Sequence, residues 1–425
     1  MMQEDIYKPS RFLYIVEAAL EYFVSILVGG AYLARVTTEL GMSDSVTGIL
    51  TSLISLGCSF QIVAIFLFGN RSVKNLVTVM HSINQLCFAL IYIVPFFEVP
   101  SGVKAGIFVV LLLSGHVVNN IVQSPKINWF MSLVDDHARG GFTAIKEIIS
   151  LMGGVVFSFA MGALMDTYEA RGDVKGSFIV CGIALFGLML LHTATLVFSR
   201  EKPAPKKARE GNGRLFSELV KDKSFLKVVL VSVLWNIASY ISTPFYGTYQ
   251  IKELGFSMVF VSVLSTVYAI CRSCFSLPLG RYADRHSFAK MLNICFFVAM
   301  FSFAVQALTV PENGKVFYTV YYMLHAVGMA GINSGSINLI YERVSVEKRV
   351  CAFALKNTLA GLAGFGTTLL SGMLVEHIQK SGNIFWGLDL YAQQVTSAIS
   401  ALVVAVILVY LNTVVKRLPL AMNAD

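Results

Sequence analysis

Two carboxylates lie four residues apart in an otherwise apolar stretch near the start of the chain. Glu17 and Glu21 share one face of that stretch if it is helical. Burial and a neighbouring like charge both favour the protonated form of a carboxylate, so such a pair suits a group that binds and releases a proton. The deeper Glu21 is the first candidate. The alternative is a structural pair held by a cation such as Arg272 or by neighbouring hydroxyls.

A second group of candidates combines amide, imidazole and aromatic side chains. These residues are His116, Asn119, Asn120 and Gln123 in one apolar stretch, Trp235, Asn236 and Tyr240 in another, and Tyr322, His325 and Asn333 in a third. Spacings of three and four put the first set on one helical stripe. Such groups suit a neutral polar ligand with hydroxyl edges and C–H faces, such as a sugar or a nucleoside. Hydrogen bonds between helices are the alternative role for the histidines.

The elements that carry these residues are long apolar segments. The chain of 425 residues is 56% hydrophobic and only 14% charged, too few charges to cover a water-soluble surface. Crossing a bilayer takes about 20 helical residues, and continuous apolar runs favour helices over barrel strands. Twelve such helices fit, at residues 12–35, 45–69, 74–97, 103–124, 143–165, 177–198, 226–249, 257–279, 289–310, 315–341, 352–376 and 389–415. The sequence thus predicts an all-α membrane protein.

Basic residues are concentrated in every second loop between these helices. Most of the 33 lysines and arginines fall before the first helix, after even-numbered helices and at the C-terminus. This pattern predicts that both termini are cytoplasmic, and it explains the net charge of +8 without any nucleic-acid partner. Residues 199–225 form the longest polar stretch and are expected to be a basic linker at the cytoplasmic face. We expect the plasma (inner) membrane of a bacterium as the location.

The two halves of the sequence repeat each other. At an offset of 210 residues, Ile127, Asn128, Val134, Arg139, Ala144, Lys146 and Gly154 match Ile337, Asn338, Val344, Arg349, Ala354, Lys356 and Gly364. At an offset of 214, the segment from Glu39 to Ser43 matches that from Glu253 to Ser257. An internal repeat of this kind predicts two pseudo-symmetric six-helix bundles, at 1–198 and 226–425.

A basic loop motif between the eighth and ninth helices has a counterpart in a known family. It reads Gly280, Arg281, Tyr282, Ala283, Asp284, Arg285, with Lys290 following. With the six-plus-six organisation, it resembles the major facilitator superfamily of secondary transporters. The resemblance implies gating by Gly280, Arg281, Asp284 and Arg285, and a central cavity lined by helices 1, 4, 7 and 10. The first-half copy, from Gly69 to Lys74, is shorter and has Asn70 where the motif has aspartate.

These features predict a transporter and not an enzyme. No HExxH, GxSxG or phosphate-binding motif occurs in the sequence, and no cofactor or metal is expected. The predicted function is proton-coupled uptake of a polar solute such as a sugar or nucleoside by alternating access, in a lipid bilayer, by a monomer. The alternative is proton-driven efflux of lipophilic or cationic compounds, since carboxylates in an aromatic cavity also bind cations. Efflux would make cation binding depend on Glu21, whereas uptake would depend on the stripe that contains Gln123.

Overall fold

The chain folds into long helices grouped in two compact units. The computed structural model describes residues 6–63, 72–135, 139–202, 212–345 and 348–418. Unit 1 comprises residues 1–42, 63–210 and 257–262, and unit 2 comprises residues 43–62, 211–256 and 263–425. Residues 43–62 of the first half thus belong to unit 2, and residues 257–262 of the second half belong to unit 1. The predicted domain bounds at 198 and 226 stay a prediction.

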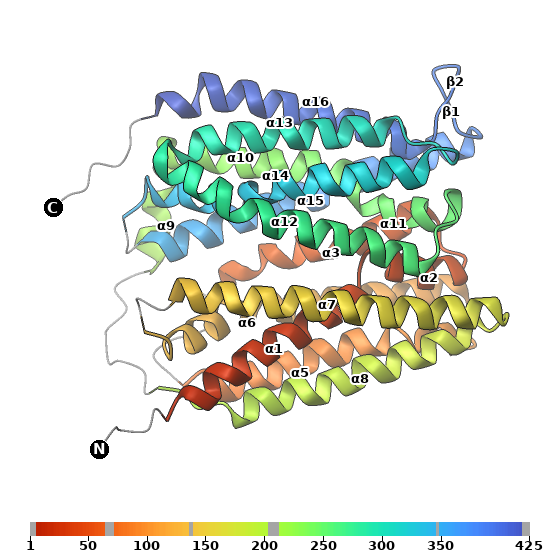
Figure 1. Cartoon of the computed structure of the whole chain (residues 1–425), viewed down its shortest axis with the longest axis horizontal. Coiled ribbons are helices and arrows are strands. Elements are labelled where there is room, and N and C mark those ends of the chain that lie inside the picture. The colour runs from red at the N-terminus through yellow and green to blue at the C-terminus, as the bar shows by residue number, and fades with distance from the viewer. Residues whose placement is uncertain (1–5, 64–71, 136–138, 203–211, 346–347, 419–425) are drawn as a thin grey trace. The chain divides into compact units, whose positions relative to one another are not determined.

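Unit 1 is built from helices of the first half. They are α1 (Lys8–Leu27), α2 (Gly30–Glu39), α5 (Lys74–Leu90), the 3-10 turn η1 (Val94–Phe96), α6 (Ser101–Met131), α7 (Arg139–Ala170) and α8 (Val174–Phe198). Helix α1 packs against α7 and α8, and α5 packs against α6 and α8 (Figure 1). The first predicted span is broken in two, because Gly30 has a φ of +52° and α1 and α2 meet at a bend of 40°.

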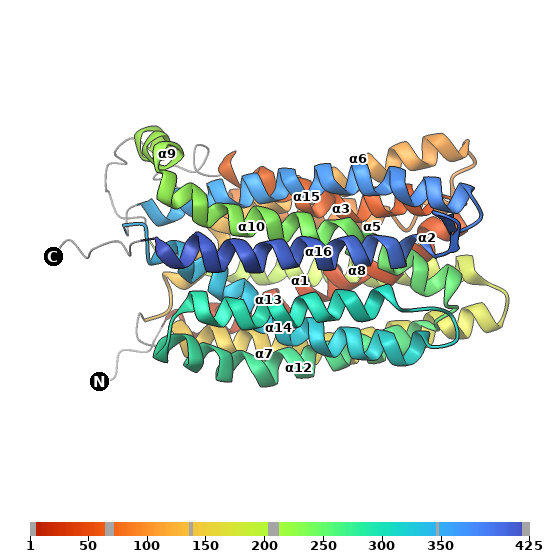
Figure 2. The same cartoon turned by 90° about the horizontal axis from the view of Figure 1, so that it is seen from above.

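Unit 2 contains α3 (Asp44–Ser59) and most of the second half. Its other elements are α9 (Asn212–Lys221), α10 (Lys223–Ser242), η3 (Thr243–Phe245), α11 (Tyr246–Thr248), η4 (Tyr249–Glu253), α12 (Met258–Arg285, whose first turn belongs to unit 1), α13 (Phe288–Ala307), α14 (Gly314–Tyr341), α15 (Arg349–Lys380), β1 (Ile384–Phe385), β2 (Leu388–Asp389), α16 (Ala392–Thr413) and η6 (Val415–Arg417). Helix α16 packs against α10 and α13, and it lies between them in the view of Figure 2. The antiparallel β1–β2 hairpin precedes α16.

Each predicted span contains a helix within the described residues. Within the described ranges, nine helices are long and apolar enough to cross a membrane, and the bent pair α1–α2 makes a tenth. Helix α5 has 17 residues, which falls short of a full crossing of about 20. Helix α14 is continuous, but its apolar sequence is interrupted by glycine, serine and asparagine residues. Both helices nevertheless lie where the sequence predicts the third and tenth spans.

Side-chain oxygens start several of these helices. Ser43, Asp173, Asp222 and Ser287 each precede a helix and accept hydrogen bonds from backbone N–H groups of its first turn. Such caps satisfy donors that have no partner inside the helix. The first turn of α12 is capped from a distance, because the Asp166 carboxylate of α7 accepts from two backbone N–H groups at 2.8 and 2.9 Å.

Part of the predicted linker is helical. Residues 203–211 lie outside the described part of the chain, but Asn212–Lys221 form α9. Glu218 on this helix pairs with Lys348 at 2.8 Å and with Arg214 at 3.0 Å. The Lys348 ammonium and the Arg214 guanidinium hold the pKa of the Glu218 carboxyl below its usual value. The ion pair between Glu218 and Lys348 thus holds α9 against the segment before α15.

A glycine lets α15 approach α3 closely in unit 2. A methyl group on Gly361 would lie 2.4 Å from the Ser55 carbonyl oxygen, whereas one on Gly366 would meet nothing within 4 Å. We therefore expect Gly361→Ala to lower the free energy of unfolding by about 1–3 kcal/mol through overpacking. Gly366→Ala is the matched control and should leave it unchanged or slightly higher. Thermal unfolding in detergent would measure both, and equal midpoints would contradict this account of the contact.

Candidate functional site

Lys126 lies inside α6 and is not a loop residue. The sequence predicts that the fourth span ends at residue 124, before Pro125, but α6 continues through Pro125 to Met131. A proline within a membrane helix is tolerated where neighbouring groups satisfy the backbone. Lys126 therefore belongs to the helix bundle of unit 1, and its side chain is only 1% exposed. It thus lies in a helix, where the sequence predicts the loop after the fourth span.

Lys126 binds both carboxylates of α1. Its Nζ donates hydrogen bonds to Glu17 Oε1 and to Glu21 Oε2, each at 2.6 Å. His192 of α8 donates from Nε2 to the same Glu17 oxygen at 2.9 Å, since a carboxylate can only accept. We call Glu17, Glu21, Lys126 and His192 the charged cluster. It joins α1, α6 and α8, and it pairs the two glutamates with Lys126 of unit 1 and not with Arg272.

The two carboxylates differ in their access to solvent. The Glu17 side chain is fully buried, whereas that of Glu21 is 24% exposed. Burying an ion is costly unless it is paired, so Lys126 is the group that makes a buried Glu17 tolerable. With both carboxylates ionised and His192 neutral, the cluster carries one net negative charge. A single added proton would neutralise it, and Glu21 is the carboxylate that solvent can reach.

Several buried polar atoms in and beside the charged cluster have no hydrogen-bond partner among the described residues. The ring of His81 on α5 lies 5.2 Å from that of His192. Within the described residues, Glu17 Oε2, His192 Nδ1 and both ring nitrogens of His81 are buried and unpartnered. Buried polar groups are usually satisfied, so an unsatisfied set at one place is a sign of function or of bound water.

The polar stripe of α6 lies in the same unit. His116 and Asn120 are buried, and the His116 ring contacts that of Phe88 at 5.0 Å. Asn119 Oδ1 and Gln123 Oε1 are buried acceptors without a partner in the described part of the chain. Lys126 follows Gln123 by three residues and continues this stripe. The predicted helical stripe is present, and it leads to the charged cluster.

The aromatic candidates gather in unit 2. The His325 ring of α14 lies 5.2 Å from Tyr321 and 6.1 Å from Trp235 of α10, in stacked orientations. Gln250 donates to the Tyr322 hydroxyl at 3.2 Å. We call Trp235, Tyr321, Tyr322 and His325 the aromatic cluster. It is closely packed, so in this structure its rings contact one another.

Three other predicted binding residues stand apart from that cluster. Asn236 donates to the carbonyl of Ser232 on its own helix at 3.0 Å. Tyr240 lies against Gly364 of α15. Asn333 is exposed, and in the described part of the chain it has no hydrogen-bond partner. These positions give no common site, and a binding role for them stays a prediction.

The predicted gating residues lie at the C-terminal end of α12. Arg281, Asp284 and Arg285 are exposed, and Gly280 has open space where a side chain would be. The three charged residues make no ion pair within the described ranges, although the sequence suggests a pair between Asp284 and a neighbouring arginine. Their gating role stays a prediction.

Half of the first-half copy of this motif lies outside the described residues, namely Gly69, Asn70 and Arg71. Its last part is held by an acidic side chain from the end of unit 1. The Glu201 carboxylate accepts from the Ser72 hydroxyl at 2.5 Å and from the backbone N–H groups of Val73 and Lys74 at 2.8 and 3.2 Å. Glu201 thus supplies an acidic group at the start of α5.

The sequence matches a family model over nearly its whole length. The Major Facilitator Superfamily model matches residues 17–365 and 237–421. The chain belongs to the Major Facilitator Superfamily. It is therefore a membrane transporter of this superfamily and not an enzyme, and the predicted fold class is confirmed.

Three similar proteins of known name or structure extend this comparison. A folate-biopterin transporter of Synechocystis sp. (strain ATCC 27184 / PCC 6803 / Kazusa) is 23% identical over 266 residues, which are 59% of this chain and 50% of that protein. The chain thus spans about half the length of that curated relative. A mutant of the nucleoside transporter NupG has a TM-score of 0.74 at 14% identity, over 95% of this chain and 99% of its own. A D-xylose-proton symporter has a TM-score of 0.65 at 15% identity, over 94% and 97%.

Sequence reasoning missed two members of the charged cluster. Lys126 carried a usable signal, because it extends the spacing of Asn119 and Gln123 by one helical turn. His192 carried none, since it is a lone histidine in an apolar helix and its partner Glu17 is 175 residues away. The structure thus adds two partners to the predicted carboxylates: Lys126 contacts both of them, and His192 contacts Glu17.

Proposed function

We propose that this superfamily member couples proton movement to the uptake of a polar solute, such as a sugar or a nucleoside. The charged cluster is the coupling site in this proposal. The observation that carries it is the sharing of the buried Lys126 ammonium by Glu17 and Glu21, each at 2.6 Å. One lysine can balance only one of the two carboxylates, so the cluster has room for a proton on the other.

Protonation would change which contacts the cluster can make. A neutral Glu21 binds the Lys126 ammonium less strongly than an ionised one, because the attraction between two opposite charges is lost. Lys126 would then be held by Glu17 alone, and α1 and α6 would be free to move apart at Glu21. Binding of a proton is thereby linked to the packing of two helices that, by family resemblance, line the central cavity.

The polar stripe of α6 supports a polar solute. Asn119 Oδ1 and Gln123 Oε1 are unpartnered acceptors one to two turns from Lys126 on the same helix. Names of similar proteins point the same way, since they include a nucleoside transporter, a D-xylose-proton symporter and a folate-biopterin transporter. We further propose that the protein acts as a monomer in the plasma (inner) membrane, with both termini in the cytoplasm.

Efflux of lipophilic cations is less well supported by this geometry. A cationic substrate would have to compete with Lys126 for Glu21, and the lysine is part of the chain and already lies 2.6 Å from that carboxylate. The fully buried Glu17 is also committed to Lys126 and His192. Cation export would therefore need the cluster to break before the substrate could bind.

Ligand-induced stabilisation tests the substrate class. The purified protein in detergent would be heated with sugars, nucleosides, amino acids, pterins or lipophilic cations, since a ligand that binds only the folded state stabilises it, by about 2.7 kcal/mol at a hundred times its Kd. We expect a sugar, nucleoside or pterin to raise the unfolding midpoint. Gln123→Ala should abolish that shift, and Asn128→Ala, which removes an exposed amide from the same helix, is the matched control. Stabilisation by lipophilic cations alone, lost in Glu21→Gln, would replace uptake with efflux.

A further inference from the structure

The seventh predicted span is interrupted near one end. Helix α10 ends at Ser242, and a 3-10 segment with Pro244 follows it. The chain then makes the short helix α11 and a π-helical segment, Tyr249–Glu253. Discontinuous membrane helices and π-helical turns are frequent at binding sites, because they leave backbone and side chains in positions that a regular helix cannot offer.

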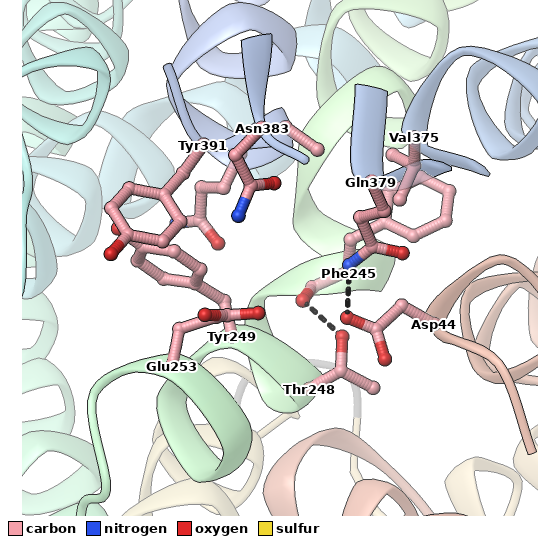
Figure 3. A pocket seen from close by; sticks show the side chains of 11 residues that line it. Asp44, Phe245, Thr248, Tyr249, Glu253, Val375, Gln379, Asn383 and Tyr391 are labelled. Carbon is pink, nitrogen blue, oxygen red and sulfur yellow. Dashed lines mark hydrogen bonds between the residues drawn. The ribbon is translucent and has the colours of Figure 1, made fainter. Parts of the chain in front are cut away.

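A pocket lies against this interrupted segment, wholly within unit 2 (Figure 3). The space between its lining residues amounts to about 280 Å³ when open solvent is included. Its walls come from the interrupted segment, from α3, from the end of α15 and from the start of α16. Its polar and aromatic lining residues include Asp44, Tyr249, Glu253, Asn383, Tyr391 and Gln393.

Of the two acidic residues of the pocket, Asp44 is paired with other side chains and Glu253 makes no ion pair in the described part of the chain. Asp44 Oδ1 pairs with the Lys252 ammonium at 2.5 Å, and its Oδ2 accepts from Gln379 at 2.8 Å. Glu253, the next residue after Lys252, is half-buried and makes no ion pair in the described part of the chain. Figure 3 shows its carboxylate beside the Tyr249 ring at the pocket. The pocket therefore presents one carboxylate that is neither balanced nor fully hydrated.

A buried amide adds a second uncommitted acceptor. Gln393 is 3% exposed, and its Nε2 donates to the Tyr318 hydroxyl at 2.7 Å. Because Nε2 makes that bond, the amide oxygen Oε1 is the atom left to accept another hydrogen bond. Oε1 has no partner within the described residues. A buried acceptor without a donor is unfavourable, and a ligand that donates a hydrogen bond would remove that cost.

Aromatic rings form one side of the same pocket. The rings of Tyr249 and Tyr391 lie 5.5 Å apart, edge to face. Ring faces attract cations, and an organic ammonium ion benefits most because it carries both N–H donors and C–H groups. A bare metal ion would need more oxygen ligands than these uncommitted groups provide. No group of three or more metal-binding side chains occurs among the described residues.

We propose that this pocket is a binding site for a small organic ammonium ion, with Glu253 and Gln393 as its acceptors and Tyr249 and Tyr391 as its walls. Lys252 already shows an ammonium bound to the adjacent Asp44. The site goes beyond the proposed function, because it shares no residue with the charged cluster and requires no proton coupling. It gives the transporter a site for a charged solute that is separate from the charged cluster.

Calorimetric titration of the purified full-length protein with methylammonium chloride tests the site. We expect saturable binding that sodium chloride at equal ionic strength does not reproduce. Glu253→Gln should weaken it about tenfold or more, as expected for loss of a charged partner. The matched control is Glu376→Gln, which removes an exposed carboxylate paired with Lys380 on α15. Gln393→Glu should tighten binding severalfold, because it places a charge at the unpartnered oxygen.

Several results would overturn the assignment. Absence of saturable methylammonium binding to the folded wild-type protein would remove the site. Equal binding of sodium would show a general cation site and not an ammonium site. Equal affinity in Glu253→Gln and Glu376→Gln would show that the pocket is not where the ion binds. A protein that fails the pH-gradient test of coupling but binds methylammonium through Glu253 would lose the proposed function and keep this inference.

Discussion

Lys126→Met should lower the free energy of unfolding by about 3–5 kcal/mol, the usual cost of leaving a buried charge without its partner. Glu17 accounts for most of this cost, because its side chain has no contact with solvent and only His192 would remain beside it. We also expect transport to stop, since α1 and α6 lose the contact that links them at both glutamates. Thermal or denaturant unfolding in detergent measures the first effect.

A matched lysine and a double variant separate the cluster from a general effect of lysine removal. Lys104 lies on the same helix, and its Nζ makes a long contact of 3.4 Å with the Pro95 carbonyl. Lys104→Met should change stability by less than about 1 kcal/mol. Glu17→Gln combined with Lys126→Met should recover much of the loss, because it removes both charges together. Equal stability of Lys126→Met and Lys104→Met would show that the charged cluster does not hold unit 1 together.

Glu21→Gln should separate coupling from solute movement. Glu21 is the solvent-accessible carboxylate of the pair, so it is the one that can exchange a proton with solvent. In proteoliposomes we expect accumulation driven by a pH gradient to fall about tenfold or more. Exchange of labelled for unlabelled solute at equal pH on both sides should continue, because the substituted amide keeps a side-chain oxygen for Lys126 and the fold is retained.

The control for this variant is Glu147→Gln on α7, where the carboxylate is exposed and makes no ion pair in the described part of the chain. It removes the same charge from the same unit and should transport like the wild type. Should Glu21→Gln accumulate solute as the wild type does, the proton is carried elsewhere. Loss of exchange as well, in a folded protein, would make Glu21 a solute ligand and not a coupling group.

The helices were predictable because the bilayer imposes one simple requirement on sequence. A span needs about 20 apolar residues with all backbone groups bonded internally, and each predicted range contains a helix. Local breaks were less visible. Pro244 lies in the 3-10 segment that follows α10, whereas the break at Gly30 depends on a positive φ that sequence alone does not fix. The fourth span was predicted to end at residue 124, but α6 continues to Met131.

Contacts between distant residues were the part that sequence could not supply. The spacing of Glu17 and Glu21 predicted a shared face, but their partner Lys126 is 109 residues from Glu17. Nothing local shows that Asp44 meets Lys252 or that Gln393 Oε1 has no partner among the described residues. Residue type and helical period thus identify the chemistry of one helix face. Which faces meet is decided by packing over the whole chain.

The most direct test of the account is accumulation of the stabilising solute by wild-type protein in proteoliposomes under an imposed pH gradient. Proton coupling predicts that an acidic outside drives accumulation above equilibrium, that a protonophore abolishes it, and that reversing the gradient reverses the direction of net movement. Equal accumulation with and without the gradient, or movement that never exceeds equilibrium, would contradict coupling through the Glu17–Lys126–Glu21 cluster.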